Sequence, residues 1–310
     1  MSRLRLSRGW LPAAAALGLG LAALLRSSAG AQSPWSLLPL EGARRTGTFR
    51  DPRLVENSGV IPSRTQPGIL WTLADSDGPA RIFATDTLGE DRGSFRLRGA
   101  RNVDWEAISA GRCEAGICLY VADTGDNLEQ RQSVQLYRIR EPRVDSLGRE
   151  PRTSSRVERL EVRYPDGSHD VEAAFVDGQG DVHLISKGRT SGFRHYRVPA
   201  GAWSAPATVA QPLGVLTIEE GRSLGRLVTD AAISPNGRLV AVRTYAEIFL
   251  FHFTGRGTLR PAWMGCRLAG LELQGEGVAW LDDSTVVLTS EGILGMPGTI
   301  SLGRCSSTSS

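Results

Sequence analysis

The stretch that decides the fold reads Asp104-Trp105-Glu106-Ala107-Ile108, and the apolar run Leu119-Tyr120-Val121-Ala122 follows it. It combines an acidic residue, a small residue and an apolar strand, which a turn joins to a second apolar strand. Four similar pairs occur along the chain: Glu56-Asn57-Ser58-Gly59-Val60 with Ile69-Leu70-Trp71-Thr72-Leu73, Asp170-Val171-Glu172-Ala173-Ala174 with Val182-His183-Leu184-Ile185, Thr229-Asp230-Ala231-Ala232-Ile233 with Leu239-Val240-Ala241-Val242, and Gly275-Glu276-Gly277-Val278-Ala279 with Thr285-Val286-Val287-Leu288. Self-similarity at long intervals is typical of repeat folds and propellers.

A third apolar strand follows each of the first four pairs, where a four-stranded meander would place it. These strands read Arg81-Ile82-Phe83-Ala84, Gln135-Leu136-Tyr137-Arg138, His195-Tyr196-Arg197-Val198 and Ile248-Phe249-Leu250-Phe251. We therefore predict an all-β, five-bladed β-propeller of four-stranded meander blades over residues 51–305. A six-bladed ring is the alternative, with a degenerate copy in residues 106–172 or in the closing segment. A pair of β-sandwiches would explain the strands but not their recurrence.

Residues 32–50 are predicted to close the ring, with Trp35–Leu40 supplying a strand to the last blade. Residues 306–310 are predicted to form a disordered tail. The five segments account for the chain after the leader, so we expect a single propeller; we also expect a monomer.

The first 31 residues are typical of an export signal. Arg3, Arg5 and Arg8 precede an uncharged run from Leu11 to Leu25, and Ala29-Gly30-Ala31 offers small residues for cleavage before Gln32. A membrane anchor is the alternative, but Arg26 ends the run before the roughly 20 apolar residues that a spanning helix needs. We therefore expect a secreted or periplasmic protein with no membrane span after the signal is removed.

Charge and cysteine content agree with this location. The formal net charge is +3, but the leader holds four arginines and no acid, so the remaining chain is close to neutral and a nucleic-acid partner is not expected. The four cysteines suit an oxidising compartment. We predict the pairs Cys113–Cys118, across a hairpin, and Cys266–Cys305, between the last two blades. A zinc site is disfavoured because Cys113 and Cys118 have no nearby histidine.

Polar residues recur at the start of every predicted inner strand. In a propeller these starts gather at one mouth of the central channel, which predicts a ring of Ser58, Glu106, Glu172, Asp230 and Glu276. The second strands end just outside it, at Asp75 and Asp77, Asp123 with Asp126 and Asn127, Lys187, Arg243 and Glu291. Crowded carboxylates raise one another's pKa, pair with basic groups or bind a cation.

Oxygen ligands converging in this way favour Ca²⁺, with Glu106, Glu172, Asp230 and Glu276 as metal ligands. Ser58, Asp75, Asp123, Asp126, Asn127, Lys187 and Arg243 are then the candidate ligand-binding residues around the mouth. The alternative is a salt-bridge network in which Lys187 and Arg243 neutralise Glu172 and Asp230.

Candidate catalytic residues outside the predicted mouth are one serine motif and the histidines. Gly221-Arg222-Ser223-Leu224-Gly225 matches a nucleophile motif, but it lies in a loop before a blade and not at a strand-to-helix turn. His169, beside Asp170, is the best-placed general base among the histidines. His183, His195 and His252 lie within strand patterns, where packing or surface positions explain them.

Three phrases resemble those of a widespread group of exported bacterial propellers: Asn102-Val103-Asp104-Trp105-Glu106-Ala107-Ile108, Ala122-Asp123-Thr124-Gly125-Asp126-Asn127 and Ala232-Ile233-Ser234-Pro235-Asn236-Gly237. The resemblance extends loosely over residues 50–305 to esterase-like-phytase and SdiA-regulated propellers, and it implies the fold and export. The acid at the start of each inner strand is also similar to calcium-activated apyrases, five-bladed propellers with Ca²⁺ at the channel, although their nucleotide-binding residues have no full match here.

Two functions follow as hypotheses. The first is a binding propeller that holds Ca²⁺ or a small polar ligand at its carboxylate-lined mouth. The second is a metal-dependent hydrolase of a phosphoric or carboxylic ester, in which Glu106, Glu172 and Glu276 hold Ca²⁺. In that hydrolase Lys187 and Arg243 would hold the anion, and His169 or a carboxylate would act as the base.

Overall fold

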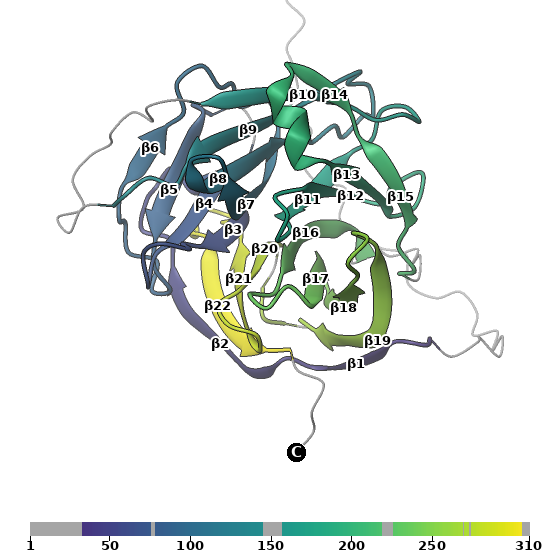
Figure 1. The fold of residues 1–310 in the computed structure, drawn as a ribbon. Helices are drawn as coiled ribbons and strands as arrows, with labels where there is room; N and C mark the ends of the chain where they lie inside the picture. Colours follow the sequence, from purple (N-terminus) through teal and green to yellow (C-terminus); the bar gives the residue numbers. More distant parts are fainter. Residues whose placement is uncertain are drawn as a thin grey trace, which may run out of the picture. The chain divides into compact units, whose positions relative to one another are not determined.

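Each repeated phrase forms the innermost strand of a small antiparallel sheet, and five such sheets form a ring (Figure 1). The structure is a computed structural model that describes residues 33–75, 78–144, 157–218, 226–268, 270–272 and 274–305. The predicted signal peptide with its cleavage site, Asp77, the motif at residues 221–225 and the tail at 306–310 lie outside the described residues. The five-bladed prediction is confirmed, and the six-bladed alternative is wrong.

Blades 1 and 3 are four-stranded. Blade 1 contains β3 (Asn57–Pro62), β4 (Leu70–Ala74), β5 (Arg81–Thr85) and β6 (Ser94–Arg96). Blade 3 contains β11 (Val171–Val176), β12 (Val182–Ser186), β13 (Arg194–Val198) and β15 (Gln211–Val215). Within each blade, successive strands pair antiparallel as in the predicted meander.

Blades 2 and 4 each gain a fifth strand that pairs in parallel at the outer edge. Blade 2 contains β7 (Trp105–Cys113), β8 (Gly116–Asp123), β9 (Val134–Arg140), β10 (Glu158–Arg163) and the added β14 (Ala207–Val209), which follows the short 3-10 helix η1 (Ala200–Ser204). Blade 4 contains β16 (Val228–Ile233), β17 (Leu239–Thr244), β18 (Glu247–Phe253), β19 (Leu259–Arg267) and the added β1 (Ser36–Pro39).

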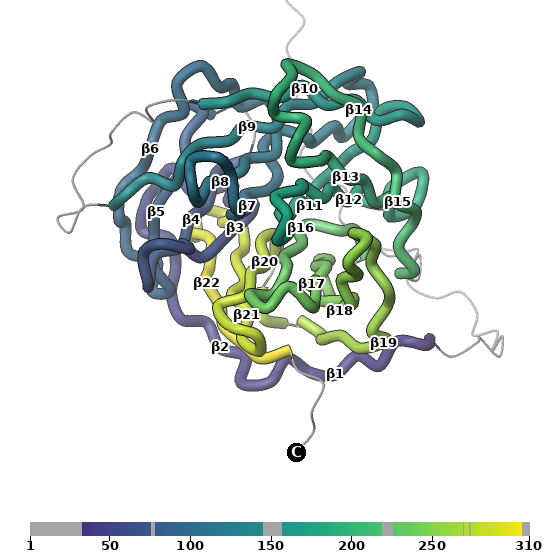
Figure 2. The backbone as a smooth tube through the Cα atoms, viewed as in Figure 1, coloured from purple at the N-terminus to yellow at the C-terminus, as the bar shows by residue number. Residues whose placement is uncertain are grey.

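Blade 5 joins the two ends of the described chain. Its strands are β20 (Gly275–Trp280), β21 (Thr285–Ser290) and β22 (Thr299–Arg304), and β2 (Glu41–Thr48) from the N-terminal side forms its outer edge. The tube in Figure 2 shows purple β2 alongside yellow β22, whereas purple β1 lies along green β19. An N-terminal strand therefore completes the last blade.

The prediction that Trp35–Leu40 joins the last blade is wrong, because β1 lies on blade 4. The Trp35 ring packs against Phe249 and Phe251 of that blade, with ring centroids 4.9 and 5.3 Å apart. Its indole N–H donates to the backbone oxygen of Thr217 over 3.1 Å. Burial of this large aromatic side chain fixes the segment on blade 4, and only the residues after Leu40 reach blade 5.

Every inner strand is bulged near its start. One extra residue interrupts the pairing between Asn57 and Val60 in β3, and equivalent shifts follow Trp105, Val171, Val228 and Gly275. A bulge re-aims side chains and is common next to functional sites. Small residues beside the bulge permit close packing of neighbouring blades, because a Cβ on Gly59 would lie 2.7 Å from the backbone nitrogen of Ile108.

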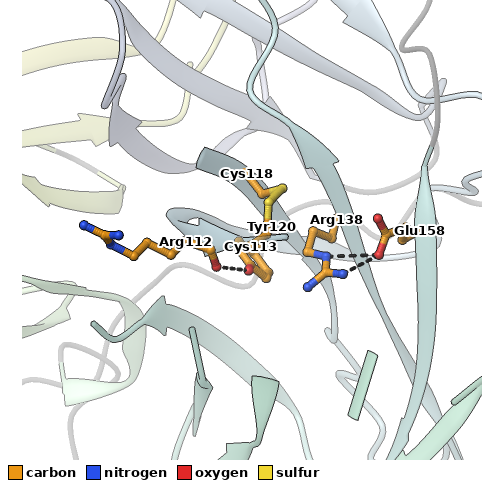
Figure 3. Close-up of a disulfide and its surroundings, with 6 residues drawn as sticks. All are labelled: Arg112, Cys113, Cys118, Tyr120, Arg138 and Glu158. Carbon is orange, nitrogen blue, oxygen red and sulfur yellow. Dashed lines mark hydrogen bonds and ion pairs between the residues drawn. A yellow bond between two sulfur atoms is a disulfide. The ribbon is translucent and has the colours of Figure 1, made fainter. Parts of the chain in front are cut away.

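Both predicted disulfides are present. Cys113–Cys118 closes the β7–β8 hairpin beside Tyr120, whose hydroxyl donates to the backbone oxygen of Arg112 over 2.7 Å (Figure 3). Cys266–Cys305 links β19 of blade 4 to the residue after β22 of blade 5. Disulfides of this kind are typical of proteins in an oxidising, extracellular environment. The described residues contain no helix with the length and hydropathy required to cross a membrane.

Candidate functional site: an acidic cluster at the mouth of the ring

The bulge residues occupy equivalent positions at the end of the ring where the inner strands begin, which we call the mouth. They are Ser58, Glu106, Glu172, Thr229 and Glu276. The three glutamates are buried. The two hydroxyls bond to neighbouring blades, since Ser58 Oγ donates to the backbone oxygen of Glu106 over 2.5 Å and Thr229 Oγ1 donates to that of Glu276 over 2.9 Å. The carboxylates are thus the groups left for chemistry.

A second set of residues follows the ends of the partner strands. Asp75, Lys187 and Glu291 each donate their backbone N–H to the residue two positions before a bulge, over 2.8, 2.8 and 3.0 Å. By the same strand register, Thr124 and Tyr245 occupy this position in blades 2 and 4. The outer set therefore comprises two acids, a lysine, a threonine and a tyrosine.

Carboxylates from the first three blades gather into one group, which we call the acidic cluster: Asp75, Asp104, Glu106, Asp170 and Glu172. Asp75, Asp104 and Glu106 each place a carboxylate oxygen within 4.8 Å of the others, and so do Glu106, Asp170 and Glu172. Glu106 belongs to both groups. This spacing is compatible with oxygen ligands around one or two hard cations.

Basic groups neutralise only part of this charge. Lys187 Nζ lies 2.5 Å from Glu172 Oε1, and Arg189 Nε lies 3.0 Å from Asp170 Oδ2. Asp170 also accepts the backbone N–H of Asp126 over 2.9 Å. Among the described residues, Asp75, Asp104 and Glu106 have no ion-pair partner.

Burial and repulsion shift the titration of the cluster. Burial, with repulsion from Asp104, raises the pKa of Asp75 to about 8. Burial raises the pKa of Glu172 to about 7 despite its contact with Lys187, and burial with repulsion from Glu172 raises the pKa of Glu106 well above its ordinary value. The cluster therefore retains protons near neutral pH unless a cation replaces them.

Glu276 and Glu291 extend this acidity toward blade 5. Burial raises the pKa of Glu276 well above its ordinary value, and burial with repulsion from Glu56 raises that of Glu291 to about 7. Burial and nearby Glu276 also raise the pKa of the Tyr245 phenol, so its hydroxyl stays protonated.

One residue of the predicted ring, Asp230, and one predicted just outside it, Arg243, perform other tasks. Asp230 lies one position past the bulge, and its carboxylate accepts the backbone N–H groups of Ala231 and Val278 over 2.8 and 2.9 Å. It joins blade 4 to blade 5 and does not enter the acidic cluster. Arg243 is completely buried, pairs with Glu272 and donates to the backbone oxygen of Gly277 over 2.6 Å. Its guanidinium is therefore not available to hold a substrate anion.

The predicted residues of the loop after β8 form a network of their own. Asp123 Oδ1 lies 3.0 Å from Arg131 Nη2, and Asp126 Oδ2 accepts the backbone N–H of Arg131 over 2.6 Å. Asn127 Oδ1 accepts from Arg189 Nη2 over 2.9 Å. These contacts hold the loop beside the cluster, so Asp123, Asp126 and Asn127 support the site from outside.

His169 does not face the carboxylates in the way a general base would require. Its Nε2 lies 3.1 Å from Asp166 Oδ1, and its Nδ1 lies 3.4 Å from Ser191 Oγ. The ring stacks on Tyr196 with centroids 5.7 Å apart. Asp166 also accepts from Tyr196 Oη over 2.9 Å, so it holds both rings in place.

Sequence reasoning missed Asp104, Asp170 and Tyr245. The two aspartates stand two residues before Glu106 and Glu172 in the repeated phrase, so the repeat itself carried the signal. Tyr245 lies two residues beyond Arg243, and only the position of the bulge reveals that it, and not Arg243, is equivalent to Lys187.

No protein-family model matches this sequence, and no curated protein matches it. The PQQ-bound aldose sugar dehydrogenase from Streptomyces coelicolor is a similar solved structure, with 12% identity and a TM-score of 0.49 over 86% of this chain and 99% of its own. Virginiamycin B lyase from Staphylococcus aureus has 11% identity and a TM-score of 0.41, over 83% of this chain and 69% of its own. The WD40 repeats of RRP9 have 13% identity and a TM-score of 0.43, over 81% of this chain and 67% of their own.

Proposed function

We propose that this chain is an exported binding propeller that holds a divalent cation, Ca²⁺ in preference to others, in the acidic cluster. The observation that carries the proposal is the sharing of Glu106 between two groups of carboxylates, each spaced for a common cation. The ligands come from three blades, so a bound ion would also connect these blades at the mouth.

Charge balance supports a cation. Five carboxylates face two basic groups, Lys187 and Arg189, and both of these are already paired. Carboxylates that raise one another's pKa gain most from a dication, which replaces bound protons and satisfies several oxygens at once. A mixed set of aspartates and glutamates without nitrogen or sulfur ligands favours Ca²⁺ over transition metals.

Glu276 offers a further point of attachment. Glu276 is 6% exposed as a residue, and its carboxylate has no hydrogen-bond partner among the described residues. Together with the Tyr245 hydroxyl it provides polar groups at the mouth on the neighbouring blades 4 and 5. A small polar ligand bound over the cation would find acceptor and donor groups there.

Binding has more support than ester hydrolysis. The hydrolase hypothesis needs free cationic groups and a base, but Lys187 is held by Glu172 and Arg243 by Glu272. His169 is hydrogen-bonded to Asp166. Export is supported by the two disulfides and by the leader-like first 31 residues.

Titration calorimetry of EDTA-stripped protein with Ca²⁺ tests the proposal. We expect saturable binding, tighter than for Mg²⁺, and a loss of affinity on the order of ten- to a hundredfold in Glu106→Gln. The matched control is Glu114→Gln, which removes an exposed acid at the β7–β8 turn and should leave binding unchanged. Absence of Ca²⁺ binding, or equal binding by the two variants, would refute the site.

A further inference from the structure

A second polar pocket lies on blade 2 beside the acidic cluster, because Asp123, which lines it, accepts the backbone N–H of Asp104 over 3.2 Å. It is open, has a volume of about 470 Å³ and is formed by the connection before β7 together with β8, β9 and β10. Its polar lining consists of Arg101, Arg131, Arg159, Asp123, Gln135 and Tyr137, and we call it the arginine pocket.

The arginine pocket carries a surplus of positive charge. Arg131 is paired with Asp123 over 3.0 Å and donates to the backbone oxygen of Gly125 over 2.8 Å. Arg101 and Arg159 are exposed, and their guanidinium groups have no ion-pair or hydrogen-bond partner among the described residues. Three guanidinium groups thus face one carboxylate, which favours an anion in the pocket.

The walls of the pocket are fixed before any ligand binds. Arg101 accepts the indole N–H of buried Trp105 on its backbone oxygen over 2.9 Å, and its own N–H donates to Tyr137 Oη over 3.2 Å. Arg159 lies directly opposite Tyr137 in the pairing of β9 with β10. The two free arginines are therefore attached to one rigid support, which lowers the entropic cost of binding.

Two acceptors in the pocket lack donors. Asp123 Oδ2 and Gln135 Oε1 are buried and have no hydrogen-bond partner in the part of the chain that the structure describes, and the two residues face each other across β8 and β9. A buried acceptor without a donor costs free energy that a bound hydroxyl group can recover. A ligand that satisfies the whole pocket must accept from the arginines and donate to these two acceptors. A simple inorganic anion can accept from the arginines, but it offers few or no donors.

We propose that the arginine pocket binds a small hydroxylated organic anion, of which a uronate and a sugar phosphate are the two chemical forms. Arg101 and Arg159 hold the anionic group, while Asp123 Oδ2 and Gln135 Oε1 accept from hydroxyl groups. Tyr137 Oη, which accepts from Arg101, is free to donate to the ligand. This proposal does not depend on cation binding in the acidic cluster, and it is tested in the presence of EDTA.

The test is ligand-observed NMR and titration calorimetry with glucuronate and glucose 6-phosphate, with glucose and inorganic phosphate as comparison compounds. We expect at least one of the two sugar anions to bind more tightly than both comparison compounds. Arg101→Ala combined with Arg159→Ala should weaken that binding at least about tenfold, as loss of charged hydrogen bonds predicts. Arg260→Ala, an exposed arginine on β19, is the matched control and should bind normally.

Gln135→Leu separates the two halves of the recognition. It should weaken binding of the sugar anion and leave any binding of inorganic phosphate unchanged. Circular dichroism checks that each variant is folded. The proposal fails if neither sugar anion binds, if glucose binds as tightly as the anions, or if inorganic phosphate binds as tightly as glucose 6-phosphate. It also fails if the Arg260→Ala control loses as much affinity as the double variant.

Discussion

At the scale of single residues, ionisation of the acidic cluster opposes folding. The pKa of Asp75 is raised to about 8 and that of Glu172 to about 7, whereas such carboxyls titrate near 4 in an unfolded chain. At pH values between the pKa of the unfolded carboxyls and the raised pKa of the folded ones, the folded protein holds protons that the unfolded chain has released. Linkage then makes the contribution of these groups to the free energy of unfolding fall as the pH rises through this window.

We therefore expect Ca²⁺ to stabilise the protein more at high pH than at low pH. At about pH 8.5 the cluster is mostly ionised and a cation relieves its repulsion, whereas at about pH 6 protons compete with the cation. Thermal unfolding with Ca²⁺ and with EDTA at both pH values measures the difference. Equal shifts of the melting temperature at the two pH values, or an unchanged difference in Glu106→Gln, would contradict this account.

Asp230 provides a prediction about stability alone. Its carboxylate accepts N–H groups from Ala231 and Val278, and asparagine has one oxygen where aspartate has two. In Asp230→Asn one of these buried N–H groups would face an NH2 group, which should lower the free energy of unfolding by about 1–3 kcal/mol. Chemical denaturation measures this loss. Ca²⁺ affinity should be retained, and a variant that unfolds normally but no longer binds Ca²⁺ would place Asp230 in the cation site after all.

At the scale of elements, strands β12 and β13 bury a pair of histidines. His183 Nδ1 lies 3.0 Å from His195 Nε2, His183 Nε2 lies 3.3 Å from Asp177 Oδ2, and Phe175 stacks on His183 with centroids 4.6 Å apart. Burial, together with the neighbouring His183, lowers the pKa of His195 to about 3. The folded state thus keeps His195 neutral where the unfolded chain would protonate it.

This pair predicts sensitivity to acid. Below about pH 6.5 the unfolded chain binds a proton that folded His195 refuses, so its contribution is complete above this pH and is lost as the pH falls, by up to about 1.4 kcal/mol per unit. Urea unfolding between about pH 4 and 7 should show a shallower loss in His195→Gln than in the natural protein. His252→Gln, which changes an exposed histidine of β18, should keep the natural slope; parallel slopes for all three proteins would contradict the assignment.

The position of the bulges explains what the sequence could and could not predict about the site. Glu106, Glu172 and Glu276 were found because the phrase repeats. Asp230 was misplaced because an aspartate follows the bulge residue Thr229, and hydropathy alone does not locate an extra residue in a strand. For the same reason Arg243 was assigned to the position beside the mouth that Tyr245 occupies in blade 4. The small residues Gly59 and Gly277 are the best available marker, because a Cβ at Gly59 would crowd the backbone of Ile108 in the next blade and a Cβ at Gly277 would crowd the Thr289 hydroxyl of its own blade.

At the scale of the whole molecule, the number of blades follows from the count of repeats, but the attachment of the ends does not. β1 and β2 are neighbours in sequence yet join different blades, and this depends on the contacts of the Trp35 ring with blade 4. The arginine pocket was equally beyond prediction, since its residues come from four separate segments. Repetition predicts what the blades share, whereas these features distinguish one blade from another.

The two disulfides differ in what they join, and this gives the last prediction. Cys113–Cys118 closes a loop within one hairpin, with a sequence separation of 5, whereas Cys266–Cys305 links blades 4 and 5 with a separation of 39. In the chain-entropy account a longer loop restricts the unfolded chain more, with roughly 4 kcal/mol expected for the long link and roughly 2 kcal/mol for the short one. The long link also lies next to the blade that β2 completes, so its removal should weaken the closure of the ring.

We expect Cys266→Ser combined with Cys305→Ser to lower the free energy of unfolding more than Cys113→Ser combined with Cys118→Ser. Denaturant unfolding at neutral pH, with EDTA present so that cation binding does not contribute, measures both losses. Hydrogen exchange should additionally locate the new flexibility in β19, β22 and β2, because these strands lie around the broken link. The reverse order of stability, or exchange that increases only within the β7–β8 hairpin, would mean that closure of the ring does not depend on the bond between the last two blades.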